Sequence, residues 1–378
     1  MSPKERLFFR ENPSGESADP GYYGANDVQL LYIFERGPVR TIDWVDGAIE
    51  LIDQTKLPHE IVVNRITELD SLIVDIQRLA VRGAPALGVA GALGVALIAA
   101  GSDDEAAVRA DAQRLRDARP TAVNLSWGVD RVLTKLGEGP AAVLQEALDI
   151  MAEDVAASIS MGLYGADLVR SLVPNETANI MTICNTGGLA AVERGTALGV
   201  IQTIHEQGWL KEVFPLETRP LLQGARLTAW ELTQMGAPFR LLVDSAGPFL
   251  LSRGIADAVF IGADRIAANG DSANKIGSFS LALAAKHAGV PFIVVAPEST
   301  IDMSTASGAD IEIEDRGSAE VVAFGGNRTT PEGTEAVNPA FDVTPHELIT
   351  AIVTDRRVIR TDLGETLTGT AFGATRTA

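Results

Sequence analysis

The feature that most constrains the fold is a change of hydrophobic pattern near residue 173. After "VPNETAN", short apolar runs alternate with amphipathic stretches; the runs include "IMTIC", "FRLLVDS", "AVFIGA" and "PFIVVAP". This alternation is typical of βαβ units, whose strands pair in parallel. The second part of the chain is therefore predicted to be an α/β domain. In such sheets ligands bind beyond the carboxyl ends of the strands, so the residues that follow each run are candidate site residues.

The first part of the chain has a different pattern. Two alternating runs flank Asp46-Gly47 and predict a β-hairpin. Helical periodicity then extends to about residue 172, with a break at Arg82-Gly83. We therefore expect a small sheet with helices. The predicted division of the chain is a flexible extension (1–30), an N-terminal domain of antiparallel strands and helices (31–172), a catalytic domain (173–364) and a flexible tail (365–378).

One segment is apolar enough to raise the question of a membrane. The run "APALGVAGALGVALIAA", from Ala84 to Ala100, holds no charged residue. Its length is close to the lower limit for a membrane-spanning helix. Glycine and alanine make up most of it, and such small side chains favour a helix packed tightly inside a soluble protein. We expect no membrane contact.

Charge and cysteine content narrow the possible partners. The 378 residues carry a formal net charge of -19. Such a surface repels nucleic acid and anionic membranes, so an anionic ligand needs a local group of basic residues. Cys184 is the only cysteine, so the chain has no internal disulfide; this fits a reducing cytoplasm, and equally an exported protein that lacks disulfides. The polar N-terminus lacks the apolar core of a secretory signal, and we expect a cytoplasmic protein.

Cys184 follows a strand-like run and precedes a glycine pair. Helical character in the residues after the pair predicts that the thiol lies near a helix N-terminus, where the helix dipole favours a thiolate. A buried cysteine that acts as a small apolar side chain fits the position equally well. Asn185, Thr186, Gly187 and Gly188 favour a site, because glycine lets a backbone come close to a ligand.

Asp264 has a comparable position, just beyond a predicted strand that ends at Ile261. Its alternative role is a helix N-cap. Downstream, Asn274 and Lys275 offer an amide and an ammonium group for a phosphate. Arg82, Gly83 and Ala84 begin the apolar helix and could form a second anion site, although an arginine there could also extend from a helix end into solvent.

Other signals are weaker or negative. Arg119 precedes a proline that ends the helix before it, and Gln223 lies in a polar segment, "ETRPLLQGARLTAWEL", whose charges surface ion pairs could explain. The chain has neither a Walker phosphate loop nor a dinucleotide-binding fingerprint. Its four histidines show no metal-ligand spacing. We therefore predict no cofactor and no metal.

Taken together, these segments resemble a family of sugar-phosphate isomerases. The family includes the methylthioribose-1-phosphate isomerases of methionine salvage, ribose-1,5-bisphosphate isomerases and translation-initiation exchange-factor subunits. The resemblance extends from about Val39 to Val358. It is carried by "VRGAPALGVAGA", "ARPTAVNL", "CNTGGLA", "GTALGVI", "ETRPLLQGARLTAWEL", "GADRIAANGDSANKIG", "STIDMSTASGADIEIEDR" and "NPAFDVTP".

The resemblance implies a fold, a site and an activity. The implied fold is a smaller N-terminal domain joined to a Rossmann-like domain, usually paired as a homodimer. Cys184 and Asp264 are the implied catalytic pair. The implied substrate contacts are Arg82, Gly83, Ala84, Arg119, Gln223, Asn274 and Lys275. The implied activity converts 5-methylthioribose 1-phosphate, a small phosphorylated sugar, to 5-methylthioribulose 1-phosphate.

The sequence departs from the family pattern at two places. Glu193-Arg194-Gly195 stands where the isomerases usually have glycine-tyrosine-glycine, and "VDSAGPFLL" replaces the more usual aspartate-serine-methionine-alanine stretch. These departures leave open which 5-substituent the sugar carries. A related 5-deoxy-pentose 1-phosphate and ribose 1,5-bisphosphate are alternative substrates, and a non-catalytic regulatory subunit is the alternative function.

Overall fold

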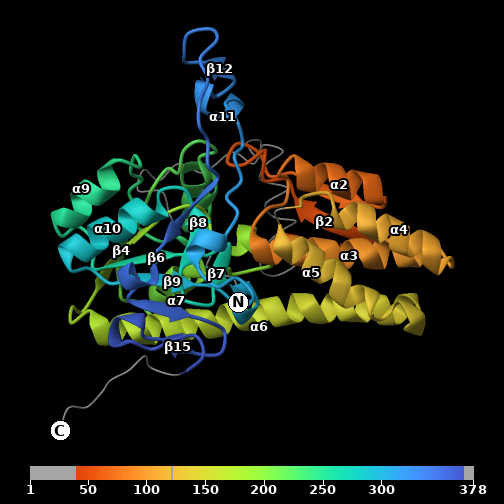
Figure 1. The fold of residues 1–378 in the computed structure, drawn as a ribbon, viewed down its shortest axis with the longest axis horizontal. Coiled ribbons are helices and arrows are strands. Elements are labelled where there is room, and N and C mark those ends of the chain that lie inside the picture. The colour runs from red at the N-terminus through yellow and green to blue at the C-terminus, as the bar shows by residue number, and fades with distance from the viewer. Residues whose placement is uncertain (1–39, 121, 370–378) are drawn as a thin grey trace, which may run out of the picture. The chain divides into compact units, whose positions relative to one another are not determined.

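The computed structural model describes residues 40–120 and 122–369 (Figure 1). Arg40–Ala378 belong to one compact unit. The predicted extension at residues 1–30 lies outside the described residues, as do positions 370–378 of the predicted tail. Within the described part of that tail, Leu367 is buried among apolar side chains of the C-terminal half.

The N-terminal half is a three-stranded antiparallel sheet followed by helices. Asp46 and Gly47 connect the first two strands, and both have positive φ (47° and 77°), which confirms the predicted hairpin. The predicted break at Arg82-Gly83 is also present, between α2 and α3. The elements are β1 (Ile42–Val45), β2 (Ala48–Ile52), β3 (Val63–Ile66), α2 (Leu69–Gln77), α3 (Ala84–Gly101), α4 (Glu105–Arg116) and α5 (Val123–Leu133).

The apolar helix α3 is the centre of this half. It is long and apolar enough to cross a membrane by length and composition, but 67% of it is buried inside the structure. Its small residues let α5 approach closely: a Cβ at Gly128 of α5 would lie 2.0 Å from the carbonyl oxygen of Gly88. The glycine and alanine content is therefore explained by tight helix packing, as the sequence predicts.

The C-terminal half is built on a six-stranded sheet in the order β15-β14-β9-β6-β4-β5. Five strands are parallel, and β15 pairs antiparallel at one edge. This arrangement confirms the predicted α/β fold. The elements are β4 (Ala178–Thr182), α7 (Ala197–Glu206), β5 (Leu210–Pro215), α8 (Ala229–Met235), α9 (Ala246–Ser252), β6 (Ala258–Ile261), α10 (Ser278–Ala288), β9 (Phe292–Val295), β14 (Ala351–Val353) and β15 (Val358–Ile359).

Helices cover both faces of this sheet. Alternate strand residues face opposite sides, so Val259 packs with α9 and α10, whereas Phe260 packs with α7 and with the helix α6 (Pro140–Leu172). The chain passes from β4 through α7 to the edge strand β5, and then returns to β6 on the other side of β4. The strand order therefore reverses beside β4, and such a reversal opens a crevice at the carboxyl ends of the two strands.

A second, smaller sheet lies next to this crevice. It has the order β10-β7-β8-β13, and its strands are only two to four residues long. Beyond it, a hairpin of β11 and β12 projects from the body of the molecule (Figure 1). The elements are β7 (Arg265–Ala267), β8 (Ser272–Lys275), β10 (Ile301–Asp302), α11 (Ala319–Val322), β11 (Ala323–Phe324), β12 (Asn327–Arg328) and β13 (Phe341–Thr344).

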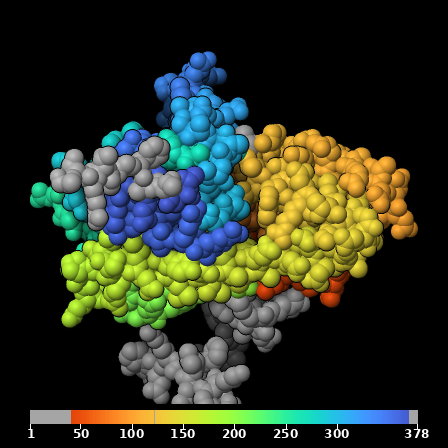
Figure 2. Space-filling model, turned by 60° about the horizontal axis from the view of Figure 1, so that its bottom comes forward, coloured from red at the N-terminus to blue at the C-terminus, as the bar shows by residue number. Residues whose placement is uncertain are grey.

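One helix belongs to both halves. The helix α6 (Pro140–Leu172) has 33 residues and runs across the face that Figure 2 turns forward. Val143 and Ala147 pack into the core around α3, whereas Met161 and Val169 pack against the six-stranded sheet. The predicted domain boundary at residues 172 and 173 coincides with the end of α6. The division into two domains stays a prediction.

Candidate active site

Cys184 and Asp264 line the same cavity. This cavity, the main pocket, has a volume of about 360 Å³, and its wall includes Arg82, Gly83, Ala84, Arg119, Gln223 and Lys275. A smaller cavity of about 50 Å³, the inner pocket, is lined by Asn274 together with Cys184 and Asp264. All nine residues predicted from the sequence therefore come together around these two cavities.

The sheet explains why the thiol and the carboxyl group meet. Cys184 lies two residues after β4 and Asp264 three residues after β6, and these two strands are neighbours. The backbone of Cys184 has a left-handed φ of 66°, which costs a non-glycine residue on the order of 1–3 kcal/mol. Two threonines hold this conformation: Thr218 Oγ1 accepts from the Cys184 N–H (2.9 Å), and Thr228 Oγ1 donates to the Cys184 carbonyl (2.6 Å).

The helix predicted to begin directly after the glycine pair is absent. The cysteine loop, residues 183–195, contains only a three-residue 3₁₀ helix, Gly188–Ala190, and α7 does not begin until Ala197. The prediction was wrong because small apolar residues in this loop imitate a helical pattern. The positive group near the sulfur is the guanidinium of Arg82, whose charge interacts with Cys184.

The glycine pair also has a role that differs from the predicted one. Neither Gly187 nor Gly188 lines the two pockets. A Cβ at Gly187 would lie 2.4 Å from Oε2 of Glu231, and a Cβ at Gly188 would lie 2.2 Å from the carbonyl oxygen of Glu193. The pair therefore lets the loop pack against protein groups behind the site, and not against a ligand.

Arg82 is held by three acceptors. Its Nε donates to Gln54 Oε1 (3.2 Å), Nη1 donates to the carbonyl oxygen of Asn185 (3.1 Å), and Nη2 donates to Asn185 Oδ1. A guanidinium has five N–H groups, so two remain for an anion or the thiol. Burial lowers the pKa of Arg82, while attraction to Cys184, Glu231 and Asp264 opposes that shift.

Gly83 and Ala84 place this arginine. Gly83 has a φ of 94°, and a Cβ there would lie 2.5 Å from the carbonyl oxygen of Ala190 in the cysteine loop. Glycine is therefore required for α3 to begin against that loop. Because α3 begins at Ala84, which lines the main pocket, the positive end of the helix dipole lies at the pocket wall, where an anion is favoured.

The carboxyl group of Asp264 accepts no hydrogen bond from the described residues. It exposes area to the main pocket, yet protein surrounds it closely. This burial raises the pKa of Asp264, against the attraction of Lys275, Arg119 and Arg82. Asp264 precedes the strand β7, so it is not the N-cap of a helix. A carboxyl group with a raised pKa is suited to proton transfer.

Lys275 and Asn274 come from strand β8. The ammonium group of Lys275 donates to the carbonyl oxygen of Ala340 (2.8 Å) and lies 4.7 Å from the centre of the Phe341 ring. An ammonium group has three donors, so the contact with Ala340 leaves capacity for a ligand. The amide of Asn274 donates to Ser278 Oγ (2.9 Å), which ties the site to the start of α10.

Arg119 makes the main pocket locally positive. Its guanidinium has no hydrogen bond to the described residues; burial lowers its pKa, and attraction to Glu314 opposes that shift. The wall of the pocket holds five cationic side chains and three carboxylates. Two of the cations, Arg265 and Arg316, form ion pairs with acids, whereas Arg119 forms none within residues 40–120 and 122–369. An anion can therefore be bound in a chain whose overall charge is negative.

Sequence reasoning missed two residues that support the site. Gln54 accepts from Arg82 and donates from Nε2 to the carbonyl oxygen of Leu189 (2.6 Å), so it links the first sheet to the cysteine loop. Glu231, on α8, is buried behind that loop. Neither has a distinctive neighbourhood in the sequence. The glycine pair was the available signal for Glu231, since close packing is one reason for adjacent glycines.

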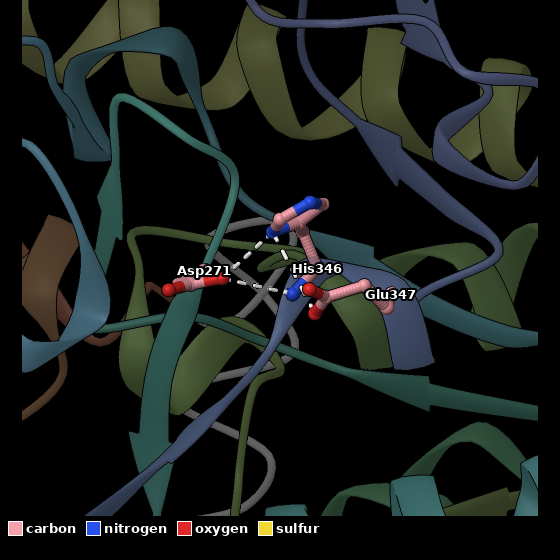
Figure 3. Close-up of side chains that lie close together, drawn as sticks. All are labelled: Asp271, His346 and Glu347. Atoms are coloured by element: carbon pink, nitrogen blue, oxygen red, sulfur yellow. Dashed lines mark hydrogen bonds and ion pairs between the residues drawn. The ribbon is translucent and has the colours of Figure 1, made fainter.

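A separate cluster of Asp271, His346 and Glu347 lies outside both pockets (Figure 3). The spacing of the histidines could not reveal it, because Asp271 and His346 are 75 residues apart. Asp271 accepts four hydrogen bonds: two from His346 (2.9 Å each), one from Asn269 (2.9 Å) and one from Gly308 (3.0 Å). The cluster therefore joins three segments of the chain.

The fold and the pocket agree with the comparisons to known proteins. The chain belongs to the initiation factor 2 subunit family, whose model matches residues 80–361. It is 48% identical over 351 residues to a methylthioribose-1-phosphate isomerase from Pelotomaculum thermopropionicum, with 89% of this chain and 95% of the relative covered.

Two further comparisons extend this relation. The crystal structure of 5-methylthioribose 1-phosphate isomerase from Pyrococcus horikoshii matches with a TM-score of 0.78 and 41% identity, and covers 85% of this chain and 92% of that one. The chain is also 50% identical over 324 residues (84% of this chain) to a probable bifunctional methylthioribose-1-phosphate isomerase/methylthioribulose-1-phosphate dehydratase from Nocardia farcinica. It spans 59% of that relative's length.

Proposed function

We propose that this chain is an isomerase that converts 5-methylthioribose 1-phosphate to 5-methylthioribulose 1-phosphate in methionine salvage. The observation that carries the proposal is the pairing of the only thiol with a carboxyl group that accepts no hydrogen bond from the described part of the chain, across one cavity that also presents Arg82, Arg119 and Lys275. The isomerase names of relatives that are about 48% identical over most of the chain support the same activity.

The substrate's chemistry explains why such a pair is needed. Phosphate blocks the anomeric oxygen of the sugar, so the ring cannot open by ordinary mutarotation. A proton must reach the ring oxygen as the bond from carbon 1 to that oxygen breaks, and carbon 2 must lose its hydrogen. The resulting enediol gains a proton at carbon 1 and loses one from its 2-hydroxyl, which gives the 2-ketose 1-phosphate. One acid and one base complete these steps.

In this proposal Asp264 handles the oxygen protons and Cys184 handles the carbon-bound hydrogen. Burial raises the pKa of Asp264, so its protonated form persists to higher pH than in an ordinary aspartate. The guanidinium of Arg82 stabilises negative charge at Cys184. Arg82, Lys275 and the N–H groups at the start of α3 anchor the phosphate, with Arg119 supplying further positive charge.

A hydride shift from carbon 2 to carbon 1 is the rival route. The two routes differ in whether the migrating hydrogen exchanges with solvent. With a thiolate base, turnover in D2O places deuterium on carbon 1 of the product, which NMR detects. Full retention of the substrate hydrogen would contradict the role given to Cys184.

The pocket wall favours an apolar 5-substituent. Beside its cations the main pocket is lined by Leu79, Leu87, Leu221, Ile311 and Ile313. A methylthio group gains by contact with such side chains, whereas a second phosphate would lose its hydration there. The test is a side-by-side assay of 5-methylthioribose 1-phosphate, 5-deoxyribose 1-phosphate and ribose 1,5-bisphosphate. We expect the highest kcat/KM for the first; a strong preference for the bisphosphate would overturn the assignment.

The second candidate is a regulatory binding subunit, which the description of the family as initiation factor 2 subunits favours. A binding subunit has no use for a thiol and an acid that face one cavity. Cys184→Ser separates the two functions, because it should abolish turnover in an isomerase without unfolding it. A variant that kept the full rate would remove the catalytic role of Cys184, and a wild-type chain without isomerase activity would favour the binding subunit.

A homodimer in the cytoplasm belongs to the same proposal. Large apolar side chains are exposed on the adjacent helices α9 and α10 and on the segment before them: Leu241, Val243, Phe249, Phe279 and Leu283. A second copy of the chain could cover them. Sedimentation of the wild type and of a Phe249→Asp variant tests the dimer, since the charge should shift the protein toward monomers.

A further inference from the structure

A buried carboxylate stands behind the cysteine loop. Glu231, in the first turn of α8, is 7% exposed and lines neither the main pocket nor the inner pocket. Its Oε1 accepts from Nδ2 of Asn185 (2.5 Å), and its Oε2 accepts from the N–H of Leu189 (3.4 Å). A buried acid that does not face the substrate needs a different explanation.

The carboxylate fixes the orientation of the Asn185 amide. Nδ2 of Asn185 donates to Oε1 of Glu231, so the NH2 group of the amide faces the carboxyl group. Burial raises the pKa of Glu231, and the hydrogen bond from Asn185 and the attraction of Arg82 oppose that shift. Nδ2 also donates to Thr228 Oγ1 (3.3 Å), whose own proton goes to the carbonyl oxygen of Cys184. The amide oxygen must then point the other way, where it accepts from Arg82.

The hydrogen bonds that begin at Glu231 lead through Asn185 to Arg82, beside the sulfur of Cys184. Asn185 supplies two of the three acceptors of Arg82, its side-chain oxygen and its backbone carbonyl, and Gln54 supplies the third. With these N–H groups fixed, the two that remain have defined directions. An arginine without these acceptors could rotate away from Cys184, because its side chain has several flexible bonds.

The packing around Glu231 is specific. A Cβ at Gly187 would lie 2.4 Å from Oε2 and 2.6 Å from Oε1 of Glu231. The glycine beside Asn185 and Thr186 therefore makes room for this carboxylate. The loop and the acid fit each other closely, which an acid serving only as part of a solvated helix face would not require.

We propose that Glu231 is a positioning residue, which acts through Asn185 to hold the guanidinium of Arg82 beside the sulfur of Cys184. The kinetic consequence rests on the proposed isomerase function. The arrangement of Arg82 and Cys184 does not, so it can be tested without substrate.

The lone cysteine makes that test direct. The pH dependence of iodoacetamide alkylation, followed by mass spectrometry of the full chain, reports on Cys184 alone. The charged groups around this part of the site are Arg82, Glu231, Asp264, Lys275 and Arg119. Glu231→Gln and Asn185→Ala should each raise the pH midpoint, by about one unit, because the positive charge becomes less well placed.

The direction of the shift separates this proposal from simple electrostatics. If Glu231 acted only through its own charge, Glu231→Gln would remove a neighbouring anion and lower the midpoint. A lowered or unchanged midpoint therefore overturns the proposal. If Glu231→Gln does not fold, Asn185→Ala provides the same test. Asn185 connects Glu231 to Arg82, so its loss interrupts the same series of hydrogen bonds, called the relay below.

The kcat/KM values of the variants provide a second test. Each single variant should lower kcat/KM on the order of tenfold, and the double variant should be no worse than the poorer single one, because both changes break one relay. The matched control is Asp257→Asn, at the amino end of β6, which accepts from the N–H of Asn179 (2.7 Å). The control should lose stability without a change in the alkylation midpoint, and losses that multiply in the double variant would overturn the relay.

Discussion

Two aspartates seven residues apart, Asp264 and Asp271, have opposite environments. Asp264 immediately precedes β7, at the open end of the hairpin of β7 and β8, and Asp271 immediately precedes β8, at its turn. Asp264 faces the main pocket without a hydrogen bond to its carboxyl group, and burial raises its pKa. For Asp271 burial also acts to raise the pKa, but hydrogen bonds from Asn269, His346 and Gly308 outweigh it and lower the pKa.

The difference shows that partners, and not residue type, decide what an acid at such a position does. A carboxylate that receives four hydrogen bonds is stabilised in its charged form and has little capacity left for a ligand or a proton. A carboxyl group without such bonds is costly to the fold and available for chemistry. The hairpin therefore places an acid that is available for proton transfer at one end, and an acid that is held by hydrogen bonds at the other.

The largest expected effect is on catalysis. Asp264→Asn should lower kcat by a factor on the order of 10² to 10⁴, because the amide cannot deliver a proton. The melting temperature should stay the same or rise, since the wild-type acid carries an uncompensated burial cost. Initial rates and thermal melts of the same preparation check both statements. A kcat within tenfold of the wild type would mean that Asp264 is not the acid.

The corresponding substitution of Asp271 should reduce stability and not catalysis. Asp271→Ala should lower the free energy of unfolding by about 1–2 kcal/mol, because partly buried donors lose their acceptor. Since the pKa of Asp271 is lowered in the folded state, its contribution exists above the unfolded pKa and disappears as the pH falls. Urea unfolding at pH 7 and pH 3 should therefore show a smaller difference at the lower pH. A large loss of kcat in the folded variant would contradict the separation of roles.

A third acid, Asp154, is intermediate between Asp264 and Asp271 in the hydrogen bonding of its carboxyl group. Asp154 of α6 receives one hydrogen bond, from the N–H of Val192 (2.9 Å), and burial raises its pKa to about 6. The folded state therefore holds this proton more tightly than the unfolded state, and stability falls as the pH rises from about 4 to 6. Asp154→Asn should raise the free energy of unfolding by about 1–2 kcal/mol at pH 8 and change little at pH 4. Equal effects at the two pH values would show that Asp154 does not titrate in this range.

The parts of the fold that sequence could predict are those with their own hydrophobic pattern. The parallel strands and the apolar helix have such patterns, and the residues after the strands could be named because parallel strands end on one side of a sheet. The sheet of β7, β8, β10 and β13 could not be predicted. Its strands have two to four residues and are held by neighbouring segments.

The residues of the candidate site also divide into those that the sequence could predict and those that it could not. Cys184 and Asp264 stand at strand ends, and residues 82–84 and 274–275 could be proposed as anion-binding groups from their positions. Arg119 and Gln223 were weak signals alone, and the resemblance to known isomerases named them. Gln54 left no signal, because an isolated glutamine suggests a solvated surface. Glu231 left only the indirect signal of the glycine pair, because an acid in a helical stretch also suggests a solvated surface. Their roles depend on hydrogen bonds between segments that are far apart in the chain: 135 residues separate Gln54 from Leu189, and 46 separate Asn185 from Glu231.

The long helix α6 has a consequence for how the molecule unfolds. Its first half completes the core around α3, and its second half covers one face of the large sheet. If either half of the protein melted alone, this helix would have to fray at its middle and leave a strip of apolar side chains in water. The two halves should therefore lose their structure together, as one cooperative unit.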